Sequence, residues 1–536
     1  MRPSGTSPLE MIYPRCRALL KREVWNALVT EHAGEKNARS FEEVIAKRSS
    51  ELGLPEFLAE LARLEFAIAE ALRRRKVIPI DPDRREINPS LILIKSSWKG
   101  LSSLIRFKKD APGDPPQRGE EHVLVWYHPK TKIVRYRPAS SNDLLVLKMI
   151  AENIDTRVVA KQGKVPTEAI EAAIDSAVED GLILEPRSLI RRGRGSSQAW
   201  QRIDKRFIES SFFTIQWHIT QACDMHCRHC YDRSDRSSLT LKQGIGILDD
   251  LADFCVSRHV RGQVSFSGGN PLLHPNFFDL YRAASDRRFV TTILGNPTTQ
   301  AKLERILEIQ KPSHYQVSLE GLEEYNDYIR GNGTYENGLA FLAILRNLGI
   351  DSHVMLTLTR DNIDQVLPLA EILRDKADSF TFNRLSQVGE GAQLTLPSRD
   401  QYRDFLIKYV EAAKTNPVIT LKDNLINIIL EKRGEELFGG CAGYGCSAAF
   451  NFLAILPDGE VHACRKFPSY IGNLHFQSIG EIYDSDAAHR YRGGTEACKS
   501  CSIRPVCGGC LAVMYGQGLD IFEARDPHCF YHSLSL

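Results

Sequence analysis

Six apolar, β-rich runs alternate with helical segments between Phe207 and about residue 435. The runs are FFTIQWHIT, GQVSFSGG, FVTTILGN, HYQVSLEG, SHVMLTLT and SFTFNRLS, and segments such as LKQGIGILDDLADFCVSR separate them. Strands that alternate with helices form parallel sheets, because each helix carries the chain back across the sheet. The pattern predicts an α/β fold with a partial (β/α)6 barrel of TIM type over residues 207–435. In such a sheet the chemistry belongs on the loops after the strand carboxyl ends.

The loop after the first run carries three cysteines at CxxxCxxC spacing. Cys223, Cys227 and Cys230 lie in CDMHCRHC, with His226 and His229 between them. A structural zinc usually takes four protein ligands, with thiolates in CxxC pairs and partners a dozen or more residues away. Three thiolates on a four-iron cluster leave one iron open to a small molecule. The spacing therefore favours a redox cluster over a structural zinc.

The motif CDMHCRHC on this loop resembles the signature of the radical S-adenosylmethionine (SAM) enzymes. The resemblance implies that Cys223, Cys227 and Cys230 bind a [4Fe–4S] cluster whose open iron chelates the amino and carboxyl groups of SAM. It also implies that the backbone of His229 meets the adenine. Reduction of the cluster in this family cleaves SAM to a 5′-deoxyadenosyl radical that abstracts a substrate hydrogen. The protein mainly positions and shields such a radical.

Two further motifs follow in the order that this family has. FSGGNP resembles the Gly-Gly-Glu-Pro motif, whose backbone holds the SAM amino group, at Gly268, Gly269, Asn270 and Pro271. Asn270 stands where glutamate is usual, which keeps an acceptor but loses a charge. SLEGLEEYNDYIRG resembles the Ser-x-Asp/Glu-Gly motif and its downstream arginine. Ser318 and Arg330 are therefore candidates for the SAM carboxylate, because a guanidinium pairs well with a carboxylate.

Eight of the thirteen cysteines lie in the last 96 residues. In a long chain without a secretion signal, clustered thiols are more often metal ligands than disulfides. Eight thiols predict two four-thiolate sites, which hold either zinc or an iron–sulfur cluster. Cys16 and Cys255 lie outside the clusters and are predicted to be small buried hydrophobic residues.

The spacing of these cysteines resembles the SPASM domain, a C-terminal extension of radical SAM peptide and protein maturases with two auxiliary [4Fe–4S] clusters. The family commonly has three residues where CGGC has two, so the division between Cys507 and Cys510 stays open. Two complete four-thiolate sets favour electron transfer or structural support over substrate ligation. The resemblance implies one cluster on Cys441, Cys446, Cys464 and Cys510, and another on Cys498, Cys501, Cys507 and Cys529.

Residues 1–118 are predicted to be mostly helical. LPEFLAELARLEFAIAEALRRR repeats apolar residues at helical spacing, which predicts one stripe of Leu58, Leu61, Leu64, Ile68 and Leu72. Residues 119–188 read as a hairpin around HPKT, the helices SNDLLVLKMIAEN and VPTEAIEAAIDSAVEDG, a C-cap at Gly181 and a closing strand, LILEP. This order predicts a winged-helix-like module. The basic residues 189–206 are predicted to be a linker, and residues 436–536 form the cysteine-rich domain.

The net charge and the sequence pattern of the chain limit the binding partners that it can have. Lys and Arg exceed Asp and Glu by only two, and the helix TEAIEAAIDSAVEDG is acidic, which argues against nucleic acid. No apolar run approaches about 18 residues, so we expect no membrane span and a cytoplasmic location. The order of elements in 119–188 resembles the PqqD-like element, which binds the leader of a ribosomally made precursor peptide as an added strand. The preceding region resembles the partner subunits of multinuclear-iron peptide oxidases.

These resemblances imply a radical SAM/SPASM peptide maturase of oxidoreductase type, similar to the selenobiotic-type maturases. Its cofactors would be SAM and three [4Fe–4S] clusters, and its partners a precursor peptide and a reductant such as flavodoxin or ferredoxin. One alternative is an enzyme similar to the anaerobic sulfatase maturases, which generate formylglycine. Another is a non-catalytic, zinc-stabilised winged-helix regulator. No residue is assigned as the general base, because that role depends on geometry.

Overall fold

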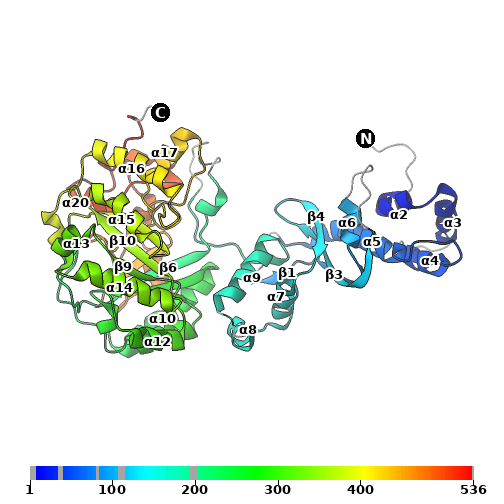
Figure 1. The fold of residues 1–536 in the computed structure, drawn as a ribbon, viewed down its shortest axis with the longest axis horizontal. Coiled ribbons are helices and arrows are strands. Elements are labelled where there is room, and N and C mark those ends of the chain that lie inside the picture. Colours follow the sequence, from blue (N-terminus) through cyan, green and yellow to red (C-terminus); the bar gives the residue numbers. More distant parts are fainter. Residues whose placement is uncertain are drawn as a thin grey trace. The chain divides into compact units, whose positions relative to one another are not determined.

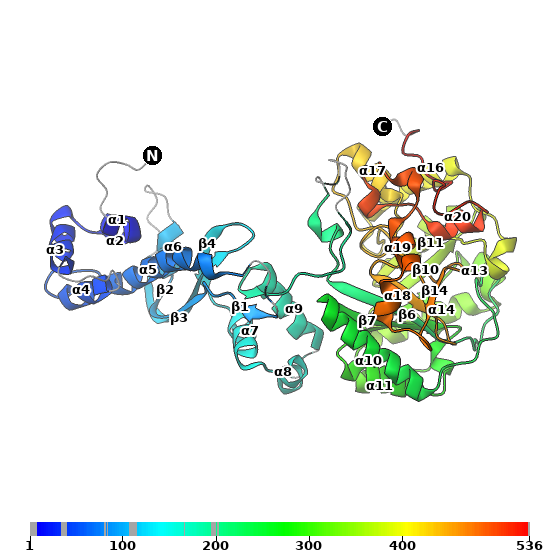
Figure 2. The same cartoon turned by 180° about the vertical axis from the view of Figure 1, so that it is seen from behind.

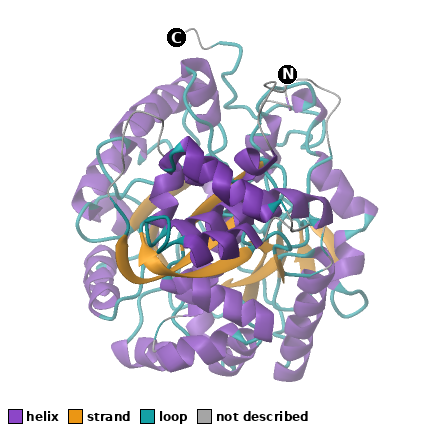
Figure 3. Ribbon diagram, turned by 90° about the vertical axis from the view of Figure 1, so that its right-hand side faces the viewer, coloured by secondary structure: helices purple, strands orange, loops and turns teal. Residues whose placement is uncertain are grey.

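The computed structural model describes residues 8–33, 40–79, 82, 84–106, 115–163, 165, 167–193, 200 and 203–533 (Figure 1). The chain forms two compact units, Met1–Arg187 and Ser188–Leu536. Both units combine helices with strands. Figure 3 colours the helices and strands of the chain differently. Among the described residues, no helix is long and apolar enough to cross a membrane.

The first unit begins with helices that pack around α5. Leu58, Leu61 and Leu64 on α5 are buried, whereas Leu72 is 44% exposed, so the predicted apolar stripe does not extend to the end of the helix. Cys16 is fully buried, as predicted. The helices are α1 (Pro8–Ile12), α2 (Pro14–Leu19), α3 (Arg22–His32), α4 (Ser40–Arg48), α5 (Leu58–Arg74) and α6 (Leu101–Arg106).

A three-stranded antiparallel sheet follows in the order β2-β3-β4. Its strands are β2 (Ile92–Lys99), β3 (Gln117–His128) and β4 (Ile133–Pro138). Strands β3 and β4 form the predicted hairpin around HPKT. Strand β2 pairs with β3 over most of its length. The sheet therefore joins residues on both sides of the domain boundary that the sequence predicts between residues 118 and 119. Ile94 of β2 and Val125 of β3 share one core with α5, which is why these residues fold together.

The two predicted helices of the following module are α7 (Ser141–Glu152) and α9 (Thr167–Glu179), and α8 (Thr156–Gly163) lies between them. Gly181 has the left-handed conformation expected of a C-cap, with φ +72°. The closing strand is β5 (Ile183–Leu184), which pairs with β1 (Glu86–Ile87). This pairing places the closing strand outside the β2-β3-β4 sheet.

The second unit contains the predicted parallel sheet. All six β-rich runs are strands, in the spatial order β11-β10-β9-β8-β7-β6, which confirms the α/β fold. Cys255 is buried in α10, as predicted. The strands are β6 (Phe212–Thr220), β7 (Arg261–Gly268), β8 (Val290–Leu294), β9 (Tyr315–Ser318), β10 (Ser352–Leu358) and β11 (Ser379–Arg384). The helices are α10 (Leu241–Arg258), α11 (Phe277–Asp286), α12 (Gln300–Ile309), α13 (Glu323–Arg330), α14 (Thr334–Asn347), α15 (Val366–Leu373), α16 (Arg399–Ala413) and α17 (Ile426–Arg433).

The cysteine-rich tail extends this sheet. β12 (Phe452–Ile455) pairs in parallel with β6, and β13 (Glu460–His462) and β14 (Tyr470–Asn473) continue the sheet in antiparallel order. The tail also contains α18 (Ile479–Tyr483), α19 (Asp486–Gly493) and α20 (Leu511–Gly516), drawn in orange to red in Figure 2. The sequence predicts a domain boundary between residues 435 and 436. Because β12 is hydrogen-bonded to β6, one sheet contains strands from both sides of this boundary, and the barrel and the tail share one core.

Part of the predicted linker packs on the second unit. Ile190 is an apolar residue within this basic stretch, and its side chain is fully buried in the core of the second unit. The Leu189 amide donates to the carbonyl of Arg258 at 3.0 Å, and Ser210 donates to the carbonyl of Ile190 at 2.9 Å. Residues 188–193 are therefore part of the folded unit, while 194–199 and 201–202 lie outside the described residues.

A buried ion pair fastens the tail to the last barrel strand. Arg384, at the end of β11, is 2% exposed. Its two terminal nitrogens donate to the two carboxylate oxygens of Asp526 at 2.9 and 2.8 Å, and its Nε donates to Asp423 at 2.9 Å. Asp526 also accepts a hydrogen bond from the backbone of Cys510 at 2.8 Å. The pair therefore positions a cysteine-bearing segment of the tail.

Candidate active site

A cavity of about 650 Å³ lies at the carboxyl ends of the six parallel strands. Every one of these strands, or the loop directly after it, contributes residues to its wall. Arg465 and Lys466 of the tail close the wall from another side. The predicted residues that line the cavity are Cys223, Cys227, His229, Cys230, Gly268, Gly269, Ser318 and Arg330. The sheet thus brings three separate sequence motifs to one site.

The three loop thiols lie together in this wall. Cys223 is exposed, while Cys227 and Cys230 are half-buried. Burial raises the pKa of the Cys227 thiol, and its neighbours Cys223 and Cys230 add to the rise. Among the described residues, no group of three histidine, cysteine or carboxylate side chains is arranged to hold one metal ion. A [4Fe–4S] cluster has a different requirement, because each thiolate binds its own iron.

The two glycines of FSGGNP support the cysteine loop through their backbones. The amide of Gly269 donates to the carbonyl of Thr220 at 2.9 Å, and that of Asn270 donates to Ala222 at 2.8 Å. A Cβ atom at position 268 would lie 2.1 Å from the Thr220 oxygen, and one at position 269 would lie 2.3 Å from the Ala222 oxygen. Only glycine permits this approach, and Gly268 also has a φ of +129°. The pair therefore forms a cradle that any side chain would fill.

Asn270 is 2% exposed and directs its side chain to protein groups. Its oxygen accepts from the backbone of Leu272 at 3.2 Å, which caps the short helix that begins at the buried Pro271. Its amide nitrogen lies 3.2 Å from a carboxylate oxygen of Asp224. The asparagine at the usual glutamate position thus contacts a carboxylate on the cysteine loop itself.

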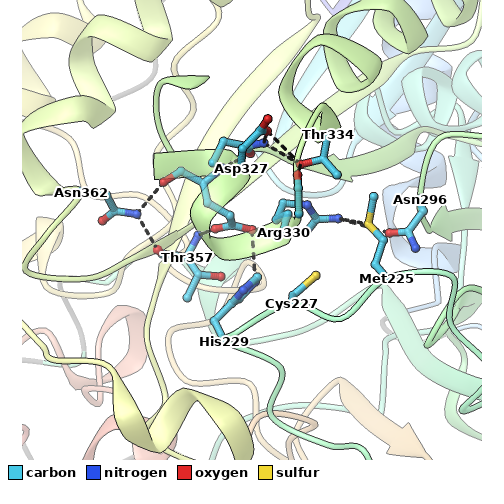
Figure 4. A network of polar contacts seen from close by, with 12 residues as sticks. Met225, Cys227, His229, Asn296, Asp327, Arg330, Thr334, Thr357 and Asn362 are labelled. Atoms are coloured by element: carbon cyan, nitrogen blue, oxygen red, sulfur yellow. Dashed lines mark hydrogen bonds and ion pairs between the residues drawn. The ribbon is translucent and has the colours of Figure 1, made fainter. Parts of the chain in front are cut away.

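The carboxylate of Glu320 contacts three residues of a polar network, His229, Arg330 and Thr357, which Figure 4 labels. It is 1% exposed and lies 3.1 Å from Nε2 of His229 and 3.4 Å from Nη1 of Arg330. Its second oxygen accepts from the backbone of Thr357 at 2.7 Å. Burial alone would raise the pKa of Glu320, but His229 and Arg330 hold this pKa below its usual value. Glu320 is therefore a charged carboxylate, and it holds two predicted site residues, His229 and Arg330, in position.

Arg330 connects this network to the cysteine loop. Its Nη2 donates to the side-chain oxygen of Asn296 at 3.2 Å and to the sulfur of Met225 at 3.2 Å. The amide nitrogen of Asn296 contacts Asp224 and lies 3.6 Å from the sulfur of Cys223. The guanidinium plane is therefore set by residues from three different loops.

Arg465 of the tail contacts Tyr231 of the cysteine loop, and the sequence motifs did not predict this contact. The hydroxyl of Tyr231 lies 3.0 Å from Nε2 of His218 and accepts a hydrogen bond from Arg465 at 3.2 Å. Burial, together with Arg465, lowers the pKa of His218 to about 3. His218 is therefore neutral at ordinary pH. Sequence signals for Tyr231 and Arg465 existed, because each directly follows a motif cysteine, Cys230 and Cys464.

The tail thiols fall into two groups. Burial raises the pKa of Cys446 to about 12, and the thiols that raise it further are Cys510, Cys464 and Cys441. A separate cavity of about 220 Å³ is lined by Cys498, Cys501, Cys507 and Cys529. The groups have the same members as the two sets that the resemblance to the SPASM domain implies. Two sets of four thiols supply the donors that two iron–sulfur clusters need.

A parallel half-barrel with three thiols after its first strand, supported by a glycine cradle, defines the architecture of radical SAM enzymes. Comparison with protein families agrees: residues 217–373 match the Radical SAM superfamily, and residues 446–510 match SPASM, the iron-sulfur cluster-binding domain. The chain therefore contains a radical SAM domain followed by a SPASM domain.

Several curated proteins are similar to this chain. An AdoMet-dependent heme synthase of Methanosarcina barkeri is 26% identical over 341 residues, which cover 59% of this chain and 96% of the relative. The mycofactocin maturase MftC of Mycolicibacterium smegmatis is 28% identical, covering 59% of this chain and 82% of the relative. The subtilosin biosynthesis protein AlbA of Bacillus subtilis is 25% identical, covering 70% of this chain and 83% of the relative.

Among solved structures, SuiB of Streptococcus suis bound to the precursor peptide SuiA is similar to this chain. The match has a TM-score of 0.49 and 17% identity, and it covers 76% of this chain and 96% of SuiB.

Proposed function

We propose that the protein modifies a ribosomally synthesised precursor peptide. The observation that carries this proposal is the presence, in one chain, of the radical SAM cavity, a complete set of eight tail thiols and a separate unit with an open sheet. The similar proteins MftC and AlbA are named as a maturase and as a bacteriocin biosynthesis protein. Peptide modification is the activity that accounts for all three features.

The cavity residues fit the cofactors that this function requires. Cys223, Cys227 and Cys230 would hold a [4Fe–4S] cluster, and Gly268 and Gly269 would keep the backbone close enough to bind SAM. Bound together, the cluster and SAM supply a 5′-deoxyadenosyl radical that abstracts a hydrogen atom from the peptide. The protein's own part is to hold these groups and exclude water.

The residues that surround the cavity have roles that follow from their contacts. Glu320 holds the guanidinium of Arg330 and the imidazole of His229 in fixed positions. Arg330, with Ser318 at the end of β9, would bind the SAM carboxylate, and the backbone of His229 would lie beside the adenine. Asn270 and Pro271 would shape the turn that presents the glycine cradle.

We propose two auxiliary [4Fe–4S] clusters in the tail. One takes Cys441, Cys446, Cys464 and Cys510, and the other takes Cys498, Cys501, Cys507 and Cys529. Because each set has four thiols, both clusters are complete and would carry electrons from a reductant such as flavodoxin or ferredoxin. Thiols that bind iron need a reducing compartment, which favours a cytoplasmic location.

The first unit would capture the peptide in the manner of a PqqD-like element. Its three-stranded sheet has two edge strands, β2 and β4. Leu93 on β2 is 49% exposed and Ile133 on β4 is 55% exposed. An edge strand offers unpaired backbone groups to an extended peptide, and exposed apolar side chains add contacts. Either edge could receive the leader of the precursor.

The experiment is to incubate the reconstituted, reduced enzyme with SAM and the peptide encoded beside its gene, and to measure the peptide mass. A mass change that requires SAM, and that the Cys227→Ala variant does not produce, supports the proposal. A deuterated peptide should also transfer deuterium to 5′-deoxyadenosine. Conversion of a porphyrin with no change in the peptide would contradict it. Oxidation of one Cys or Ser to formylglycine would instead identify the sulfatase-maturase alternative.

A further inference from the structure

A second cavity of about 540 Å³ lies in the second unit and shares no lining residue with the candidate active site. Its wall is strongly basic. Asp484 is the one carboxylate among the described residues that line it, against five arginines. The arginines are Arg191, Arg192, Arg258, Arg492 and Arg504. A wall with this excess of positive charge is suited to an anion.

Several donors in this wall are buried without a partner. The Nε atoms of Arg192 and Arg258 and the indole nitrogen of Trp200 are buried and have no hydrogen-bond partner. All three groups can only donate a hydrogen bond. Leaving a buried donor unpaired is costly, more so when it carries charge. The wall therefore lacks acceptors, which an oxygen-rich ligand would supply.

The guanidinium groups are held in place by neutral partners. Arg192 donates to the carbonyls of Tyr444 and Cys446, the latter at 2.7 Å, and lies over the ring of Phe450. Arg492 donates to the carbonyls of Ala449 and Tyr483 at 2.8 and 2.7 Å. Carbonyl oxygens orient a guanidinium but do not cancel its charge. Neutral groups therefore hold these two guanidinium groups in position, as a preorganised binding site requires.

Two further arginines are available to a ligand. Neither Arg191 nor Arg504 has a side-chain hydrogen bond or ion pair with a described residue. Arg258 pairs with Asp484. Because like charges repel, the five arginines of this wall repel one another, and a bound anion would relieve that repulsion.

We propose that this cavity binds a phosphate-bearing small molecule. A phosphate group offers at least three acceptor oxygens and up to two charges, whereas one carboxylate offers two oxygens and one charge. Guanidinium groups that converge from separate loops match the phosphate better, since each can bind a different oxygen. The volume lies in the range of sites for small ligands. This site is independent of the proposed peptide modification.

Titration calorimetry on the full-length, cluster-loaded protein tests the proposal. The probes are inorganic phosphate, pyrophosphate and ADP, with an acidic peptide as a separate arm. The variants are Arg191→Gln and Arg504→Gln, since losing either side chain breaks no described contact. Arg282→Gln is the matched control, because Arg282 is an exposed arginine on α11 outside the cavity.

We expect saturable binding of at least one phosphate compound to the parent protein and to R282Q. In R191Q and R504Q the dissociation constant should rise roughly tenfold or more, the usual effect of losing a hydrogen bond to a charged group. Binding of pyrophosphate as tight as that of ADP would identify an inorganic ligand, and preference for ADP an organic phosphate. No saturable binding at millimolar ligand, equal binding by all variants, or binding of the acidic peptide alone would overturn the proposal.

Discussion

The hydroxyl of Tyr231 accepts a hydrogen bond from Nη1 of Arg465 at 3.2 Å. This contact joins the two cysteine-bearing parts of the enzyme, because Tyr231 directly follows Cys230 and Arg465 directly follows Cys464. Tyr231 also contacts the buried His218. The phenol of Tyr231 therefore links the cysteine loop of the radical SAM domain to a loop of the SPASM domain.

Replacing Tyr231 by Phe should weaken this junction. The change leaves Arg465 and His218 without their shared partner, which should lower the free energy of unfolding by about 1–3 kcal/mol. Urea unfolding followed by tryptophan fluorescence measures the effect. Tyr328→Phe is the control, because Tyr328 is 52% exposed and its loss should change stability by less than about 0.5 kcal/mol. Equal midpoints for Y231F and Y328F would contradict the prediction.

Alanine at Gly268 or Gly269 should displace the cysteine loop. The added Cβ would collide with the carbonyl oxygen of Thr220, the last residue of β6, or with that of Ala222 in the loop that follows. We expect each variant to lose about four irons per chain, the content of one cluster. Iron analysis after anaerobic reconstitution measures this loss.

Gly246→Ala provides the matched control for the glycine variants. Gly246 lies in α10, and a Cβ there would meet nothing within 4 Å. Alanine in a helix interior is favoured over glycine by about 0.5–1 kcal/mol, so this variant should keep its iron and gain stability. If G268A and G269A retained as much iron as G246A, the cradle would have no part in holding the loop.

Breaking the Arg384–Asp526 pair should release the tail. Both side chains are almost fully buried. Removing Asp526 leaves the buried guanidinium of Arg384 with one carboxylate partner, Asp423, instead of two, at a cost of up to about 3–5 kcal/mol. We expect Asp526→Ala to lower the urea midpoint of the second unit and to make its tail sensitive to protease. Asp400→Asn removes the exposed pair with Arg403 and should leave the urea midpoint unchanged, because exposed ion pairs contribute little to stability. A protease-resistant D526A protein would count against this clamp.

The first unit should lose stability in acid through Asp143. Burial acts to raise its pKa, but Arg137 and the Ser140 cap lower this pKa to about 2. The unfolded value is about 3.9, so the stabilisation is complete above about pH 4 and disappears as the pH falls towards 2. Its size is about 2 kcal/mol.

Hydrogen exchange of peptides that cover α7 measures the Asp143 contribution. Asp143→Asn should exchange faster than the parent protein at pH 7, and the difference should vanish near pH 2. Glu152→Gln, at the exposed end of the same helix, is the control and should change stability by less than about 0.5 kcal/mol. A difference between D143N and the parent that stayed constant with pH would exclude the charged pair as its cause.

The barrel strands were predictable because each is an apolar, β-rich run, and β6, β7 and β9 also end at a motif. Strands β2 and β12 were not predicted. β2 lies in a stretch between prolines that was assigned to a mostly helical region, and β12 is a four-residue run whose partner, β6, lies more than 200 residues earlier. Short strands take their stability from such partners, which the local pattern does not contain.

The candidate site was predictable where motifs specify it and hidden where the fold assembles it. Cys223, Cys227 and Cys230 are recognised by their spacing, their place after the first barrel strand and the motifs that follow. Glu320 lies inside the quoted SLEG motif, but its importance depends on Thr357 from the next strand and His229 from the first loop. The basic cavity also combines residues from distant segments, and no local motif marks it.

The most direct test of the central claim is reductive cleavage of SAM by the anaerobically reconstituted enzyme. We predict about twelve irons per chain and formation of 5′-deoxyadenosine on reduction, with no such product from Cys227→Ala. Cys255→Ala, which removes a buried cysteine outside the clusters, should behave like the parent protein. Stoichiometric zinc without iron, or no 5′-deoxyadenosine from an iron-loaded parent protein, would contradict the account.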